Sequence, residues 1–130
     1  LATTASSVWG IGEYPLSVST AKQNARMNGF HNSRFFVGDA AEMIQETKRK
    51  LSEIDLISCN PPRKGLQPRA LEAILSVGAR KLIYVSCDPV TLARDMDRLT
   101  KNGYQTMSLQ PFDMLPQTEE VESLAILEKA

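Results

Sequence analysis

The stretch LIYVSCDPVTLARD, residues 82–95, decides the fold. Its apolar beginning is typical of a buried strand, and the turn Ser86-Cys87-Asp88 then leads directly into Pro89. Asp88 can cap a helix with its side chain, and Pro89 suits the first helical position because its fixed φ is already helical. We therefore predict a strand over residues 81–86 and a helix over residues 89–102.

The same alternation of strand and helix extends over the rest of the chain. Short apolar runs bounded by glycine, proline or asparagine predict strands, and apolar residues at helical spacing predict the helices between them. The strands are predicted at residues 8–11, 34–37, 54–59, 81–86, 104–109 and 123–127, and the helices at residues 15–27, 40–51, 68–77 and 89–102. This order predicts an α/β, Rossmann-like fold with a mostly parallel sheet covered on both faces. The last two strands have no helix between them, which predicts an antiparallel edge.

The composition excludes several classes of protein. The 130 residues, of which 42% are hydrophobic, suffice for one buried core. Basic and acidic residues balance at 15 each, whereas a protein that binds nucleic acid on its own is usually basic. A catalytic module beside a basic partner domain is compatible with this balance. Two cysteines make no disulfide framework, and the chain shows no signal peptide or membrane-length apolar stretch, so we expect a soluble, cytoplasmic protein without a membrane partner.

Polar residues gather where the predicted strands end. In an open α/β sheet, ligands bind at the carboxyl ends of the strands. The groups at these ends are, in chain order, Gly12-Glu13, Asp39, Asn60-Pro61-Pro62-Arg63 and Ser86-Cys87-Asp88. This order suits a nucleoside cofactor, with an acid for the ribose, a further polar residue for the base, and the reacting groups farther along the chain.

Cys87 is the leading candidate for a reactive group. It lies just before a predicted helix, whose first backbone N–H groups favour an anion such as a thiolate. The neighbouring Asp88 opposes this effect. The alternative is a buried cysteine that acts as a small apolar side chain, and position alone supports both interpretations equally. Cys59 lies inside a strand, and we interpret it as a core residue.

The turn Asn60-Pro61-Pro62-Arg63 is the second candidate. Two prolines hold it extended and rigid, so Asn60 is expected to face a pocket at the sheet edge. The alternative is a turn that starts a helix, with the asparagine as its cap. Amino-methyltransferases use a similar asparagine-proline-proline turn, but Arg63 replaces the aromatic residue that usually follows it in them.

Together these segments resemble the S-adenosylmethionine-dependent uracil-C5 RNA methyltransferases, which act on tRNA or 23S rRNA. The resemblance covers essentially the whole chain, in order and with suitable spacing. It rests on Asn24-Ala25, Asn28-Gly29, Gly38-Asp39-Ala40, Pro61-Pro62-Arg63-Lys64-Gly65, Ser86-Cys87-Asp88-Pro89, Thr91-Leu92-Ala93-Arg94-Asp95, Asp113-Met114-Leu115-Pro116-Gln117-Thr118 and Glu122.

The resemblance implies a role for each candidate residue. S-adenosylmethionine would be the cofactor, and RNA the substrate. Cys87 would be the nucleophile that adds to uracil C6, and Glu122 the base that removes the C5 proton. Without the resemblance, Glu122 would be interpreted as an exposed acid that opens the last strand. Asp39 would meet the adenine end of the cofactor, and Asn60 would line the space between target base and methyl donor.

Two positions depart from the family pattern. The family usually carries aspartate where this chain has Asn60, which can form hydrogen bonds but supplies no negative charge. The family also places a ribose-binding acid where this chain has Gly12. Glu13 can replace that acid only if the turn shifts by one residue, because neighbouring side chains in an extended segment point in opposite directions.

The match to the family begins after its first strand and glycine-rich cofactor loop. We therefore expect residues 1–130 to form a partial methyltransferase catalytic domain that lacks the first strand and meets RNA through domains absent here. In this fold the first strand is central, so its absence leaves two unpaired strand edges. Because unpaired edges are unfavourable, we expect that the strands pair in a rearranged order, that chains associate by exchanging strands, or that the chain is a piece of a longer protein. The two cysteines exclude a four-cysteine iron–sulfur site within the chain, and no metal site is expected.

Two functions are compatible with these observations. The first is the catalytic part of an RNA uracil-C5 methyltransferase, supported by Cys87 and Glu122. The second is a non-catalytic, methyltransferase-like module for binding or assembly, supported by Gly12, Asn60 and the missing glycine loop.

Overall fold

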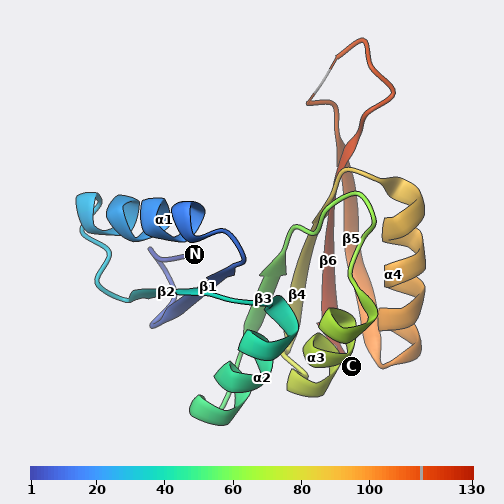
Figure 1. Ribbon diagram of the computed structural model, residues 1–130. Coiled ribbons are helices and arrows are strands. Elements are labelled where there is room, and N and C mark those ends of the chain that lie inside the picture. The colour runs from blue at the N-terminus through green and yellow to red at the C-terminus, as the bar shows by residue number, and fades with distance from the viewer. Residues whose placement is uncertain (115) are drawn as a thin grey trace. The chain divides into compact units, whose positions relative to one another are not determined.

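The computed structural model describes residues 1–114 and 116–130 and divides the chain into two compact units, Leu1–Thr47 and Lys48–Ala130 (Figure 1). Leu115, which belongs to one of the motifs that carry the family resemblance, lies outside the described residues. Along the described part of the chain, no helix has the length and apolar character that crossing a membrane requires. Each unit is described by itself below.

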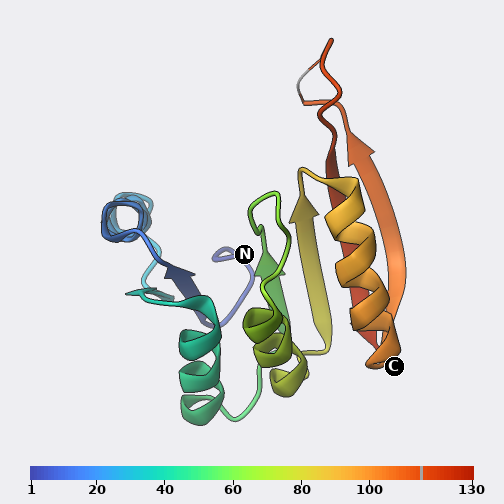
Figure 2. The same ribbon diagram turned by 45° about the vertical axis from the view of Figure 1, so that its right-hand side comes forward.

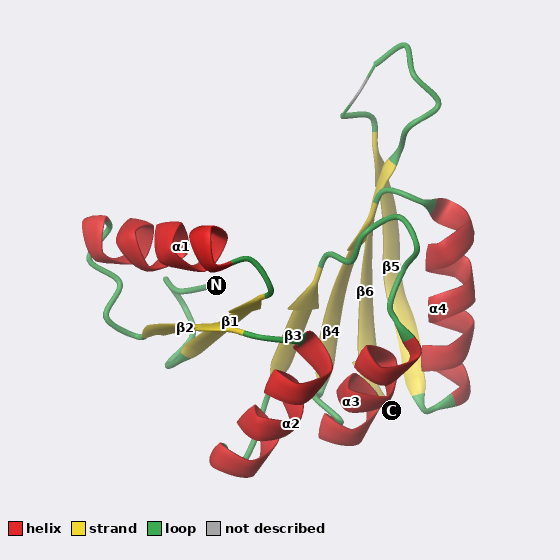
Figure 3. Ribbon diagram, viewed as in Figure 1, coloured by secondary structure: helices red, strands yellow, loops and turns green. Residues whose placement is uncertain are grey.

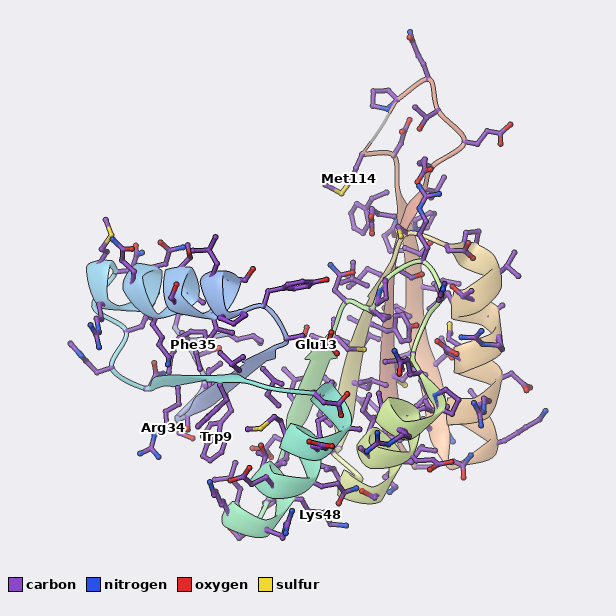
Figure 4. All side chains as sticks on the ribbon, in the orientation of Figure 1. Trp9, Glu13, Arg34, Phe35, Lys48 and Met114 are labelled. Carbon is purple, nitrogen blue, oxygen red and sulfur yellow. The ribbon has the colours of Figure 1, made fainter. Side chains whose placement is uncertain are left out.

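The first unit is built on two parallel strands, β1 (Val8–Gly12) and β2 (Ser33–Val37), which are joined by helix α1 (Pro15–Met27). Helix α2 (Ala40–Lys50) starts in this unit. Phe35 lies between the strands and α1, whereas Trp9 and Arg34 lie on the opposite face (Figure 4). A Cβ atom at Gly10 would stand 2.5 Å from the Phe35 ring, so this ring packs against β1 only because residue 10 has no side chain.

The second unit contains a four-stranded sheet in the order β3-β4-β6-β5 (Figure 3). Its elements are β3 (Leu56–Cys59), α3 (Pro68–Val77), β4 (Lys81–Ser86), α4 (Pro89–Lys101), β5 (Tyr104–Phe112) and β6 (Glu122–Lys129). Strands β3 and β4 are parallel, and β6 is antiparallel to both β4 and β5. The antiparallel end of the sheet is confirmed, with one refinement. The antiparallel strand β6 lies inside the sheet, and β5 is at the edge.

Helices α3 and α4 lie on the same face of this sheet (Figure 2). Alternate residues on the two central strands are accordingly buried, because successive side chains of a strand point to opposite faces. The buried set comprises Leu82, Tyr84 and Ser86 on β4, Ser123, Ala125 and Leu127 on β6, Leu71 and Ile74 on α3, and Leu92 and Leu99 on α4. This pattern fixes the register of β4 against β6, in which Ser86 pairs with Ser123.

The elements agree closely with those expected from the sequence. The bounds of α3 and β4 are the predicted ones, and the other helices agree within one residue. Strand β5 continues three residues beyond the predicted end, to Phe112, because its backbone stays paired with β6 although its side chains are exposed.

Within the described residues, β1 pairs only with β2, and β3 pairs only with β4.

Candidate active site

Cys87 lies in the two-residue connection between β4 and α4, and it is half-buried. Ser86 and Asp88 fix this turn. The Ser86 hydroxyl accepts a hydrogen bond from the Asp88 backbone N–H (3.1 Å) and donates to the Asp88 carbonyl oxygen (2.9 Å). The Asp88 carboxylate caps α4 by accepting from the Thr91 N–H at 2.9 Å, and this bond is the main reason that the pKa of Asp88 lies below its ordinary value. The predicted cap and the predicted helix start at Pro89 are thereby confirmed.

Glu122 begins β6, which pairs with β4, the strand that Cys87 follows. Ser86 pairs with Ser123 in the antiparallel β4–β6 ladder. Cys87 follows Ser86 and Glu122 precedes Ser123, so these two residues occupy the next step at the same end of the ladder. The structure thus brings together a thiol and a carboxylate that are far apart in the sequence.

The turn from Asn60 to Arg63 leaves β3 at the same end of the sheet, because β3 and β4 are parallel and Cys59 pairs with Tyr84. Asn60 is exposed. The Thr91 hydroxyl of α4 donates to the Arg63 carbonyl oxygen at 2.9 Å, which attaches the turn to the helix that Cys87 precedes. The loop that carries Asn60 and Arg63 is therefore hydrogen-bonded to α4, the helix that Cys87 precedes.

Arg63 also connects this turn to the segment before β6. Its guanidinium donates a hydrogen bond to the Glu120 carboxylate. That bond, followed by the negative charge of Glu120, raises the pKa of Arg63 above its ordinary value, and Cys87 and Asp88 also contribute. A permanent cation therefore lies within electrostatic reach of both Cys87 and Asp88.

Cys59 has a different environment from Cys87. Desolvation, with a contribution from the negative charge of Asp95, raises the pKa of the Cys59 thiol to about 12. A thiol with this pKa remains protonated at neutral pH and is a poor nucleophile. The interpretation of Cys59 as a structural residue therefore agrees with its surroundings.

Asp95 is a residue that the sequence analysis did not single out for a role. It is fully buried in α4, where one carboxylate oxygen accepts from the Tyr84 hydroxyl and from the Leu66 N–H, both at 2.7 Å. The other carboxylate oxygen accepts from the Arg94 guanidinium. A sequence signal existed, because Asp95 falls between Leu92 and Leu99 on the apolar stripe of α4, where an acid needs buried partners.

In the first unit, Glu13 directly follows the end of β1 (Figure 4), and Asp39 lies two residues beyond the end of β2. These two strand ends are joined by a hydrogen bond from the Gly38 N–H to the Gly12 carbonyl oxygen (3.1 Å). Glu13 is exposed, and one Asp39 oxygen accepts from the Glu42 N–H at 3.1 Å in the first turn of α2. The structure therefore gathers the predicted residues into two groups, Glu13 with Asp39 in one unit, and Asn60, Cys87 and Glu122 in the other.

Known proteins share this arrangement of elements. The family described as tRNA (uracil-5-)-methyltransferase matches residues 14–130. An uncharacterised RNA methyltransferase of Geobacter sulfurreducens is 46% identical over 99% of this chain and 26% of its own length. One of Halalkalibacterium halodurans is 44% identical over 98% of this chain and 28% of its own length. The chain thus spans about a quarter of the length of these curated relatives.

Solved structures agree with this family. The tRNA (uracil-54, C5)-methyltransferase of Pyrococcus abyssi, solved in complex with S-adenosyl-L-homocysteine, has a TM-score of 0.79 and 29% identity over 98% of this chain and 30% of its own. An rRNA methylase of Streptococcus thermophilus has a TM-score of 0.73 at 18% identity, over 99% of this chain and 76% of its own, and shows the shared fold. With its motifs, sheet order and family match in agreement, this chain belongs to the tRNA (uracil-5-)-methyltransferase family.

Proposed function

We propose that the chain is part of the catalytic domain of an RNA uracil-C5 methyltransferase, with Cys87 as nucleophile and Glu122 as base. The observation that carries this proposal is their position at one end of the β4–β6 ladder, one step beyond the pair Ser86–Ser123. A nucleophile and a base on neighbouring strands can act on adjacent atoms of one small ring.

The chemistry proceeds through a covalent adduct between protein and RNA. The Cys87 thiolate forms a bond to uracil C6, and the electron pair of the C5–C6 double bond moves into an enolate at C5, C4 and O4. C5 would then attack the methyl group of S-adenosylmethionine, which would supply it and leave as S-adenosylhomocysteine when the bond between sulfur and the methyl carbon breaks. The Glu122 carboxylate removes the C5 proton, the C5–C6 double bond re-forms, and the bond between Cys87 and C6 breaks to release the thiolate.

The donor set fits a nucleoside cofactor. Glu13 and Asp39 offer carboxylates at the ends of two paired parallel strands, the position at which open α/β sheets bind nucleotides. We assign Asp39 to the adenine end and Glu13 to the ribose. Asn60 follows the strand next to β4, and we assign it to the space between the methyl donor and the target base.

RNA is the proposed substrate, and an rRNA or tRNA uridine the proposed target. The chain is electrically balanced, so contacts that bind RNA tightly would come from other parts of a longer enzyme. The target base must leave its stack to reach Cys87.

RNA containing 5-fluorouridine tests this proposal. Fluorine at C5 cannot leave as a proton, so the adduct between Cys87 and C6 accumulates after methyl transfer. We expect the full-length protein, given S-adenosylmethionine, to form an adduct that survives denaturing electrophoresis. Cys87→Ala should abolish it and Cys59→Ala should retain it, because the thiol of Cys59 is held protonated.

The alternative is a non-catalytic module that retains the fold for binding or assembly. It is favoured by the neutral, exposed Asn60 and by Gly12 at a position where the family carries an acid. The same experiment decides between the two functions. An intact protein that binds RNA but forms no Cys87-dependent adduct is the non-catalytic module.

A further inference from the structure

Three residues of helix α4 bind the backbone that follows the proline turn. The Thr91 hydroxyl donates to the Arg63 carbonyl oxygen (2.9 Å), and the Arg94 guanidinium donates to the Lys64 carbonyl oxygen (2.8 Å). The Asp95 carboxylate accepts from the Leu66 N–H at 2.7 Å. We call Thr91, Arg94 and Asp95 the α4 clamp. Three residues within about one turn of α4 thus bind three residues of the loop between β3 and α3, which passes beside α4 (Figure 3).

Gly65 shows how closely the loop fits the clamp. Its φ of 74° lies in the left-handed region that favours glycine. A Cβ atom at this position would stand 2.5 Å from an Asp95 oxygen and 2.6 Å from an Arg94 nitrogen. Neither atom can withdraw freely, because Asp95 is fully buried and Arg94 is bonded to it. The loop therefore has little room for another position.

The buried end of the clamp is anchored in the sheet. The same Asp95 oxygen that accepts from Leu66 also accepts from the Tyr84 hydroxyl (2.7 Å), and Tyr84 lies on β4, the strand that leads to Cys87. The Arg94 guanidinium is bonded to the other Asp95 oxygen. Loop, helix and strand thereby share one buried carboxylate.

We propose that the α4 clamp positions the proline turn against Cys87, so that Thr91 and Asp95 are positioning residues for the methyl-transfer reaction. The clamp lies on α4, the helix that Cys87 precedes, and the loop that it binds carries Asn60 and Arg63 at its start. Because the clamp fixes the position of the proline turn relative to Cys87 before the substrate binds, loss of the clamp slows formation of the covalent adduct without weakening RNA binding. This inference rests on the function proposed above.

Thr91 allows a test that leaves the fold intact. Thr91→Val keeps the shape of the side chain and removes the hydroxyl, which donates to the Arg63 carbonyl oxygen and, at the longer distance of 3.3 Å, to the Asp88 carbonyl oxygen, whereas Thr91→Ser keeps the hydroxyl. Thr100→Val is the matched control, since the Thr100 hydroxyl donates within α4 to the Asp97 carbonyl oxygen, away from the loop. The rate of adduct formation is measured in the full-length protein at saturating 5-fluorouridine RNA, with the RNA dissociation constant and the melting temperature of each variant.

We expect Thr91→Val to slow adduct formation about tenfold, since displacement of a reacting group by a fraction of an ångström costs this much. Its RNA dissociation constant and melting temperature should stay near those of the wild type, and Thr91→Ser and Thr100→Val should react at the wild-type rate. Gly65→Ala, which must displace the loop, should be slower than Thr91→Val. A Thr91→Val rate equal to that of the wild type, or a Thr91→Ser rate as low as that of Thr91→Val, overturns the positioning role alone. A wild-type protein without any Cys87-dependent adduct overturns the proposed function, and this role with it.

Discussion

The buried pair of Tyr84 and Asp95 makes a quantitative prediction about stability. Both side chains are fully buried, and the Tyr84 hydroxyl donates to a carboxylate oxygen at 2.7 Å. A hydrogen bond to a charged group contributes about 1.5–3 kcal/mol, so Tyr84→Phe should lower the free energy of unfolding by about 2 kcal/mol. The Leu66 N–H still satisfies part of the carboxylate, which keeps the loss below that of an unpaired buried charge.

Tyr104 provides a matched control in the same unit. It is also buried, and its hydroxyl donates to a neutral acceptor, the Ala79 carbonyl oxygen, at 2.8 Å. A bond between neutral groups contributes about 1 kcal/mol, so Tyr104→Phe should lower the free energy of unfolding by about half as much as Tyr84→Phe. The two variants remove the same atom from equally buried rings, and they differ in the charge of the acceptor.

Native-state hydrogen exchange of the amides of β4 and β6 measures this difference. These amides lie in the centre of the sheet, and their slowest exchange reports unfolding of the unit that contains both tyrosines. We expect the order wild type, Tyr104→Phe, Tyr84→Phe from most to least protected. Equal losses in the two variants would refute the reasoning that Asp95 is a charged acceptor at the centre of this unit.

Two further predictions concern the Cys59 thiol and the ion pair of Arg63 with Glu120. Cys59 has a folded-state pKa of about 12 against an ordinary value of 9.0, so its contribution to stability is complete below pH 9 and lost as the pH rises towards 12. Cys59→Ala should flatten this alkaline decline in urea titrations at pH 8 and pH 10.5; an unchanged decline would mean that Cys59 is not its source. Arg63→Gln removes the bond to Glu120 and the cation near Cys87, and it should slow adduct formation while leaving the melting temperature unchanged, since Arg63 is exposed. Glu120→Gln, which keeps the cation, should be the milder variant, and the reverse order would contradict the role of the cation.

Local signals in the sequence were sufficient for most elements. Helix α3 begins at Pro68 and is followed by Gly78 with a φ of 67°, and these are the two residues that mark such ends in a sequence. Strand β4 ends where its apolar run meets Ser86, and α4 starts behind an aspartate cap. Residues that start or end a helix or strand in this way act within a few positions of the boundary, so they can be recognised without knowledge of the tertiary structure.

Contacts between residues far apart in the sequence could not be predicted from such local signals. No local pattern states that β6 lies between β4 and β5, because this order depends on which strands bury their apolar faces together. The bond between Arg63 and Glu120 joins residues 57 positions apart, and both are charged residues of ordinary appearance in the sequence. The role of Asp95 follows from Tyr84 and Leu66, which reach it from other elements. Sequence motifs identified the candidate residues Cys87, Glu122 and Asn60. The long-range bonds around Arg63 and Asp95 became apparent only from the packing of the structure.

The packing of β6 connects the core of this unit with its candidate chemistry. Ser123, Ala125 and Leu127 are buried on the face that α3 and α4 cover, and this alternation sets the register in which Ser86 meets Ser123. A slip of one residue would turn Glu122 towards that core and move it away from Cys87, at the cost of exposing the residues now buried. Apolar side chains in the middle of the sheet therefore determine which residue of β6 comes next after the pair Ser86–Ser123, at the end of the ladder where Cys87 lies. The thiol itself is placed by the capped start of α4, so two independent features of the fold, a strand register and a helix cap, bring the proposed nucleophile and base together.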